Sequence, residues 1–191
     1  MRRAAAVALL LWPAAASAHE GSIAGGFSAG FSHPLTGLDH LLAMVAVGIW
    51  GAILGRPLLF ALPVTFPAMM AVGGLFGIAG LPFAPVEIGV ALSVLVLGGA
   101  IAANWRAPVP VAILLVAAFA LFHGYAHGSE LPAAADPLYY SLGFMLATGM
   151  LHLLGIAIGT LHGHARGRPL ARGIGGLIAL SGMAFLWLAL A

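Results

Sequence analysis

The sequence predicts an all-α membrane protein with six transmembrane helices that follow a cleaved signal peptide. Of its 191 residues, 62% are hydrophobic and only 6% are charged, and the mean hydropathy is +1.11. A soluble domain carries about 25% charged residues, and a chain of this size cannot bury so many apolar side chains in its interior. The composition therefore excludes a soluble globular enzyme, a disordered chain and a nucleic-acid-binding protein.

Residues 1–18 are predicted to be a signal peptide. Two arginines form a positive n-region, an apolar run too short to span a membrane follows, and an Ala-Ser-Ala sequence ends at Ala18. Cleavage after Ala18 would leave one transmembrane domain over residues 19–191. An uncleaved anchor is the alternative, and Pro13 with the polar stretch after it disfavours that alternative.

Six later apolar stretches are each long enough to cross a hydrocarbon core of ~30 Å, which takes ~20 residues of helix. Each break between them combines a turn-forming residue with a charge or a proline. Asp136 before Pro137 is interpreted as a helix start. The predicted spans lie near residues 35–54, 57–80, 85–103, 108–127, 137–161 and 172–190.

The arginines predict the orientation in the membrane. All five arginines after the predicted signal peptide lie in the first, third and fifth loops: Arg56, Arg106, Arg166, Arg168 and Arg172. Cytoplasmic loops of membrane proteins carry an excess of positive charge. Both ends of the mature chain are therefore predicted to lie outside, in a multi-pass protein of the bacterial inner membrane.

Histidines and acids gather near the predicted outer side, and intramembrane ionisable groups are functional candidates by default. His123, His127 and Glu130 are spaced i, i+4 and i+7, which places them on one face of a helix. The chain has no cysteine, and two imidazoles with a carboxylate suit a borderline divalent metal such as Ni²⁺, Co²⁺ or Zn²⁺. The interleaved glycines predict that another helix approaches closely.

A second set of candidate ligands precedes and opens the first predicted span. Pro34 suits a helix start, and His33 and His40, seven residues apart, would share a face if the helix reaches back that far. Asp39 points about 100° away from His40 on a helix. Its carboxylate either binds the metal or fixes the tautomer of an imidazole.

Five other residues are candidate ligands with competing structural interpretations: His19, Glu87, His152, His162 and His164. Cleavage before His19 would free an α-amine that could chelate metal with its imidazole. Glu87 would also be favoured at a helix N-terminus by the macrodipole. His152 is interpreted as a pathway ligand, a buried hydrogen-bond partner or a core residue. His162 and His164 lie in a predicted cytoplasmic loop. They are interpreted either as ligands at the metal exit or as solvated side chains.

These two motifs resemble signatures of the HupE/UreJ family of hydrogenase and urease accessory membrane proteins. HPLTGLDH, residues 33–40, is similar to the first-span signature, and FHGYAHGSE, residues 122–130, is similar to the fourth-span signature. The family is regarded as secondary permeases for nickel and, in some members, cobalt. The resemblance implies metal uptake that supplies hydrogenase or urease maturation proteins. The family-matching positions are His33, Asp39, His40, His123, His127 and Glu130.

The sequence thus predicts a secondary permease that imports Ni²⁺, or Co²⁺ or Zn²⁺, and holds no tightly bound cofactor. It contains no lysine and no phosphate-binding G-x-x-x-x-G-K-[ST] loop, so an ion gradient, the membrane potential or a partner must drive uptake. One alternative is a membrane-embedded zinc hydrolase, with His123 and His127 as ligands and Ser93 or Ser141 as polar support. The other is a non-transporting metal-binding assembly factor.

Overall fold

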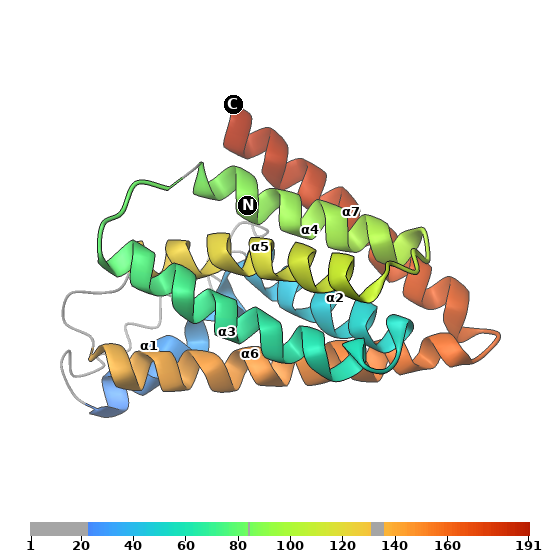
Figure 1. Cartoon of the computed structure of the whole chain (residues 1–191), viewed down its shortest axis with the longest axis horizontal. Coiled ribbons are helices and arrows are strands. Elements are labelled where there is room, and N and C mark those ends of the chain that lie inside the picture. The colour runs from blue at the N-terminus through green and yellow to red at the C-terminus, as the bar shows by residue number, and fades with distance from the viewer. Residues whose placement is uncertain (1–22, 84, 131–135) are drawn as a thin grey trace, which may run out of the picture.

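The computed structural model describes residues 23–83, 85–130 and 136–191, and these residues form helices with no strand (Figure 1). The predicted signal peptide lies outside the described residues. The α-helices are α1 (Ile23–Thr36), α2 (Leu38–Leu54), α3 (Leu58–Ile78), α4 (Val86–Ala102), α5 (Val109–Ser129), α6 (Pro137–Thr160) and α7 (Gly167–Leu190). A short 3₁₀ helix, η1 (Leu161–Gly163), connects the last two.

Each of the six predicted apolar stretches corresponds to a helix, α2 to α7, with two differences at the ends. The chain before the first stretch forms a separate helix, α1, and α7 begins at Gly167 rather than at residue 172. Four helices are long and apolar enough to cross a membrane: α3, α5, α6 and α7. The bent pair of α1 and α2 passes the same test as one broken or re-entrant span, and α4 is shorter, at 17 residues. The count of six spans stays a prediction.

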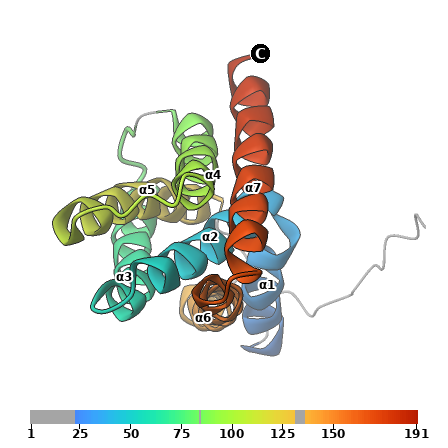
Figure 2. The ribbon, with the colours of Figure 1, turned by 90° about the vertical axis from the view of Figure 1, so that its right-hand side faces the viewer.

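Helix α2 lies at the centre of the bundle (Figure 2). It packs against α1, α3, α4, α6 and α7, and every residue from 43 to 51 is buried. Met44, Ile49 and Trp50 are the large apolar side chains that this central helix contributes to the core. A helix that is apolar on all sides is typical of the interior of a bundle, and the position of α2 agrees with that rule.

Glycines allow the closest helix pairs to form. A Cβ atom on Gly73 or Gly77 of α3 would overlap the backbone of α5, and one on Gly124 or Gly128 of α5 would overlap the backbone of α3. In a bilayer, small residues let helix backbones approach and gain van der Waals contact. The close approach of another helix to the glycines between the α5 histidines was predicted from the sequence and is confirmed.

Polar side chains cap several helix ends. The Asp136 carboxylate accepts hydrogen bonds from the backbone nitrogens of Leu138 (2.9 Å) and Tyr139 (3.3 Å), so the predicted helix start is confirmed. At the other end of the bundle, the Arg106 guanidinium donates to the carbonyl oxygen of Ile53 at the end of α2. Arginine there satisfies a carbonyl group that has no partner within its helix.

Candidate metal site

Four histidines from three helices meet at one end of the bundle, and we call them the histidine cluster: His33 of α1, His40 of α2, and His123 and His127 of α5. The ring centroids of His40 and His127 are 4.4 Å apart, and those of His40 and His123 are 4.6 Å apart. The ring of His33 lies 4.8 Å from that of His127. The structure therefore brings together the four histidines that the two sequence motifs supply.

The bend between α1 and α2 places the two N-terminal histidines. Gly37 separates the helices with an extended backbone (φ −85°, ψ 107°), and the helices differ in direction by 80°. The helix of α2 therefore does not reach back to His33, and the condition under which His33 and His40 would share one helix face is not met. Both rings nevertheless contact His127, because the bend directs α1 back towards α5 and α6.

Asp39 orients the ring of His40. One oxygen of its carboxylate accepts hydrogen bonds from Nδ1 of the His40 ring and from the backbone nitrogen of His40, each at 2.8 Å. A carboxylate can only accept, so Nδ1 carries a proton, and in the neutral ring Nε2 then presents a lone pair. Of the two roles that the sequence allowed for Asp39, this geometry favours fixing the tautomer.

Ser93 of α4 contacts His123. From the sequence, Ser93 was a candidate only as polar support in the hydrolase alternative, and its direct pairing with His123 was not predicted. The Ser93 hydroxyl lies 2.7 Å from Nε2 of His123 and donates to the carbonyl oxygen of Val90 at 2.6 Å. Both the serine and the histidine are fully buried. Thirty residues separate them in sequence, so no local pattern could have revealed the pair.

Several buried nitrogen atoms of the cluster have no hydrogen-bond partner: Nε2 of His40, Nδ1 of His123, and both ring nitrogens of His127. A buried polar atom without a partner costs about 1–3 kcal/mol, so their concentration in one place favours a ligand-binding role. Among the described residues, no three histidines or acids yet converge on one point. Binding one ion through three of them would therefore require some rings to turn.

Three acids line a cavity of about 460 Å³ beside the cluster, which we call the acidic cavity. Asp39, Glu87 and Glu130 come from the ends of α2, α4 and α5, and His40 lies at the same cavity. Phe185 and Leu188 of α7 close one side. The structure thus places the predicted carboxylates near one another and next to an imidazole of the cluster.

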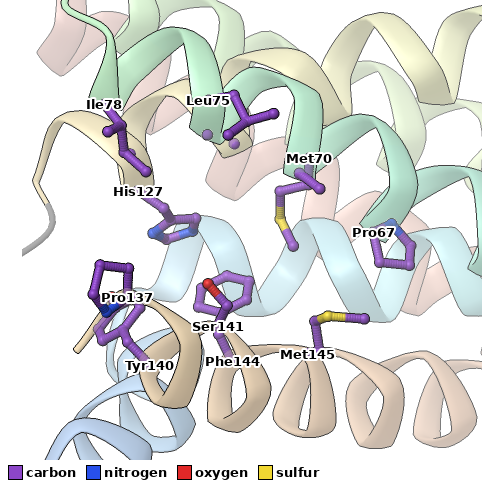
Figure 3. A pocket seen from close by; sticks show the side chains of 14 residues that line it. Pro67, Met70, Leu75, Ile78, His127, Pro137, Tyr140, Ser141, Phe144 and Met145 are labelled. Carbon is purple, nitrogen blue, oxygen red and sulfur yellow. The ribbon is translucent and has the colours of Figure 1, made fainter. Parts of the chain in front are cut away.

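His127 also faces a second cavity of about 270 Å³ between α3, α5 and α6 (Figure 3). Its walls are largely apolar and include Met70, Tyr140 and Phe144. His127 has no hydrogen bond to hold its ring. The cavity therefore gives space beside a buried ring that no hydrogen bond holds.

Phe66 of α3 connects the cluster with a histidine deeper in the bundle. Its buried ring lies 5.4 Å from that of His123 and 5.5 Å from that of His152, measured between centroids. Nε2 of His152 and the hydroxyl of Thr148, both on α6, are buried without a partner. Phe66 is one of ten phenylalanines, and nothing in the sequence distinguishes it from the rest.

The remaining predicted candidates lie elsewhere. His162 in η1 is buried near Arg106, Arg168 and Arg172, whose positive charges disfavour a cation there. His164 is exposed in the loop before α7. His19 lies outside the described residues.

Comparison with known proteins agrees with the motifs. The family described as HupE / UreJ protein matches residues 7–185. Protein HupE of Rhizobium leguminosarum bv. viciae is 44% identical over 180 residues, which is 94% of each chain. No solved structure matches. With a family match across nearly the whole chain and a full-length relative at this identity, the chain belongs to the HupE/UreJ family.

Proposed function

We propose that this protein is an inner-membrane secondary permease that imports a divalent transition metal, Ni²⁺ first and Co²⁺ second, for the maturation of a metalloenzyme. The observation that carries the proposal is the histidine cluster, in which buried imidazole nitrogens without partners meet beside the acidic cavity. Membership of a family of hydrogenase and urease accessory proteins supports the same function.

The acidic cavity would collect the cation. Glu87 and Glu130 are exposed, and Asp39 is partly buried at the same cavity. A cleft lined by one sign of charge raises the local concentration of the opposite ion. The carboxylates would therefore attract a hydrated divalent ion to the point where the first imidazole is reached.

The imidazoles would then replace part of the water shell of the ion. Neutral imidazole is a good ligand for Ni²⁺, Co²⁺ and Zn²⁺. His40 already presents a lone pair at Nε2, and His127 has space in which to turn. An inside-negative potential favours inward movement of two positive charges by about 4.6 kcal/mol per 100 mV. In this proposal His152, which lies beyond Phe66, would be the next imidazole on the inward path.

The arrangement gives less support to a hydrolase. In the zinc hydrolase that the sequence left open, His123 and His127 would hold the ion, and Ser93 or Ser141 would give polar support to a metal-bound water. Ser93 donates its proton to the Val90 carbonyl and is fully buried, although it contacts an imidazole. Ser141 lines the largely apolar cavity. Ser93 therefore has no proton left to donate to such a water, which gives this alternative less support than the permease.

The direct test is accumulation of ⁶³Ni in cells that lack other nickel importers. We expect uptake with the wild type and loss of uptake with His127→Ala and with Asp39→Ala, at equal amounts of protein in the membrane. Ser32→Ala is the control, because within the part of the chain that the structure describes its exposed hydroxyl bonds to Ala29 of its own helix. Normal accumulation in both site variants would refute the site. No uptake of nickel or cobalt by the inserted wild type would refute the function.

A further inference from the structure

We infer that Ser93 is a positioning residue that selects which nitrogen of His123 is offered to the transported metal. The inference rests on the proposed function and adds a residue outside both sequence motifs. It starts from one short contact between two fully buried side chains, the Ser93 hydroxyl and Nε2 of His123, at 2.7 Å.

The number of protons fixes the direction of this contact. A serine hydroxyl has one proton to donate and can accept through its lone pairs. The Ser93 proton is directed to the Val90 carbonyl oxygen at 2.6 Å, and a carbonyl oxygen can only accept. The contact with His123 must therefore run the other way, with the Nε2–H of His123 donating to the Ser93 oxygen.

This direction determines the tautomer of His123. A neutral imidazole carries one proton, so a proton on Nε2 leaves Nδ1 with a free lone pair. Nδ1 of His123 is buried and has no partner in the protein. With the opposite tautomer, an N–H group would occupy that position and would repel a cation. Ser93 therefore prepares His123 to bind metal through Nδ1.

Asp39 fixes the opposite tautomer in the neighbouring ring, that of His40. It holds the Nδ1 proton of His40 and leaves Nε2 free. The rings of His40 and His123 lie 4.6 Å apart and almost perpendicular, at 89°. Two adjacent imidazoles thus present opposite nitrogens, and each is held by a different polar partner. Partners of this kind fix the ring orientation of metal-binding histidines in general.

The first experiment reads the tautomer without any metal. Solid-state NMR of ¹⁵N-histidine-labelled protein in lipid bilayers distinguishes protonated from unprotonated ring nitrogens, and His123→Gln assigns the signal. We expect the Nε2–H form of His123 in the wild type and a shift towards the Nδ1–H form in Ser93→Ala. A wild-type His123 with its proton on Nδ1 would overturn the inference.

The second experiment measures the dissociation constant for Ni²⁺ in lipid nanodiscs by titration calorimetry. We expect Ser93→Ala to weaken binding about 10–100-fold, and Ser93→Thr, which keeps the hydroxyl, to restore most of it. Ser181→Ala is the matched control, because Ser181 also donates to a carbonyl of its own helix, that of Leu177, and among the described residues it makes no hydrogen bond to a histidine. Unchanged affinity in Ser93→Ala would overturn the inference.

These experiments separate the role of Ser93 from the proposed function. A wild type that binds Ni²⁺ but transports none would refute the permease, while the affinities would still test Ser93. A wild type that does not bind Ni²⁺ would refute both the metal site and the use of Nδ1 as a ligand. Equal ⁶³Ni uptake by the wild type and Ser93→Ala at subsaturating nickel would count against the positioning role.

Discussion

The histidines of the cluster differ in how firmly the protein holds them. His40 is bound by Asp39 and His123 by Ser93, whereas His127 has no hydrogen bond and faces a cavity. Rotating a side chain costs least where no hydrogen bond must break. His127 is therefore the ring that we expect to turn when an ion binds, while His40 and His123 act as fixed ligands.

The effect of Asp39 on the orientation of the His40 ring can be separated from the effect of its charge. Asp39→Asn keeps an oxygen that can accept from Nδ1 of His40, whereas Asp39→Ala removes both the acceptor and the charge. We expect Asp39→Ala to weaken Ni²⁺ binding about 10–100-fold and Asp39→Asn to fall between it and the wild type. Calorimetric titration in nanodiscs measures the series. Equal losses in the two variants would show that charge, rather than ring orientation, is the contribution of Asp39.

Uptake should also depend on external pH in a defined direction. A metal binds neutral imidazole, and free imidazole gains a proton and a positive charge below pH ~6.5. Acidification of the outer side therefore removes ligands and adds repulsion, so the initial rate of uptake should fall between pH 7.5 and pH 5.5. Proteoliposomes with a clamped potential and fixed internal pH provide the measurement. A rate that rises on acidification would instead indicate proton-driven import.

For single residues, the sequence predicts which side chains are candidate ligands better than it predicts which side chains contact each other. The i, i+4 spacing of His123 and His127 placed both on one face because a helix imposes that geometry locally. Ser93 and Phe66 could not be found in the same way, since they contact the histidines only through packing of α4 and α3 against α5. Such contacts depend on the rotation and crossing of whole helices, which no local pattern records.

At the scale of single elements, the pairing of α3 with α5 determines where the histidines of α5 lie. Glycines of both helices meet at this interface, and a side chain on either helix would force the backbones apart. The bend at Gly37 has a similar role for α1 and α2. The sequence indicated the glycine-lined approach but not the bend, because a Gly between two helical stretches does not define the angle of the break.

The glycine interface predicts a large difference between two glycine substitutions. Gly73→Ala places a Cβ against the Leu121 carbonyl of α5, whereas Gly99→Ala of α4 meets nothing within 4 Å. We expect the first to lower the free energy of unfolding by about 1–3 kcal/mol. The second should leave it unchanged or raise it by up to ~1 kcal/mol, because alanine is the better helix former.

Unfolding of both variants by SDS in mixed micelles, followed by tryptophan fluorescence, measures the difference. The two alanines add the same group to a helix, so changes in micelle binding affect them equally. Equal stability of Gly73→Ala and Gly99→Ala would contradict the close α3–α5 contact.

Across the whole molecule, the two ends of the bundle have opposite chemistry. The acidic cavity and the histidine cluster occupy one end, and the arginines after α2, after α4 and around the start of α7 occupy the other. The sequence predicted this separation from loop composition alone, since alternate helices return the chain to the same side.

The orientation of this polarity in the membrane can be tested with single cysteines, because the chain has no cysteine of its own. Leu81→Cys places a thiol in the exposed loop between α3 and α4, and His164→Cys places one in the exposed loop before α7. With arginine-bearing loops inside, a membrane-impermeant maleimide added to intact cells should label residue 81 and not residue 164. Residue 164 should react only after the membrane is permeabilised, and a variant that carries both cysteines provides an internal standard.

The reverse pattern would put the histidine cluster on the cytoplasmic side and turn the proposed importer into an exporter. Labelling of both residues in intact cells would mean that the helices between them do not carry the chain across the membrane as an odd number of spans.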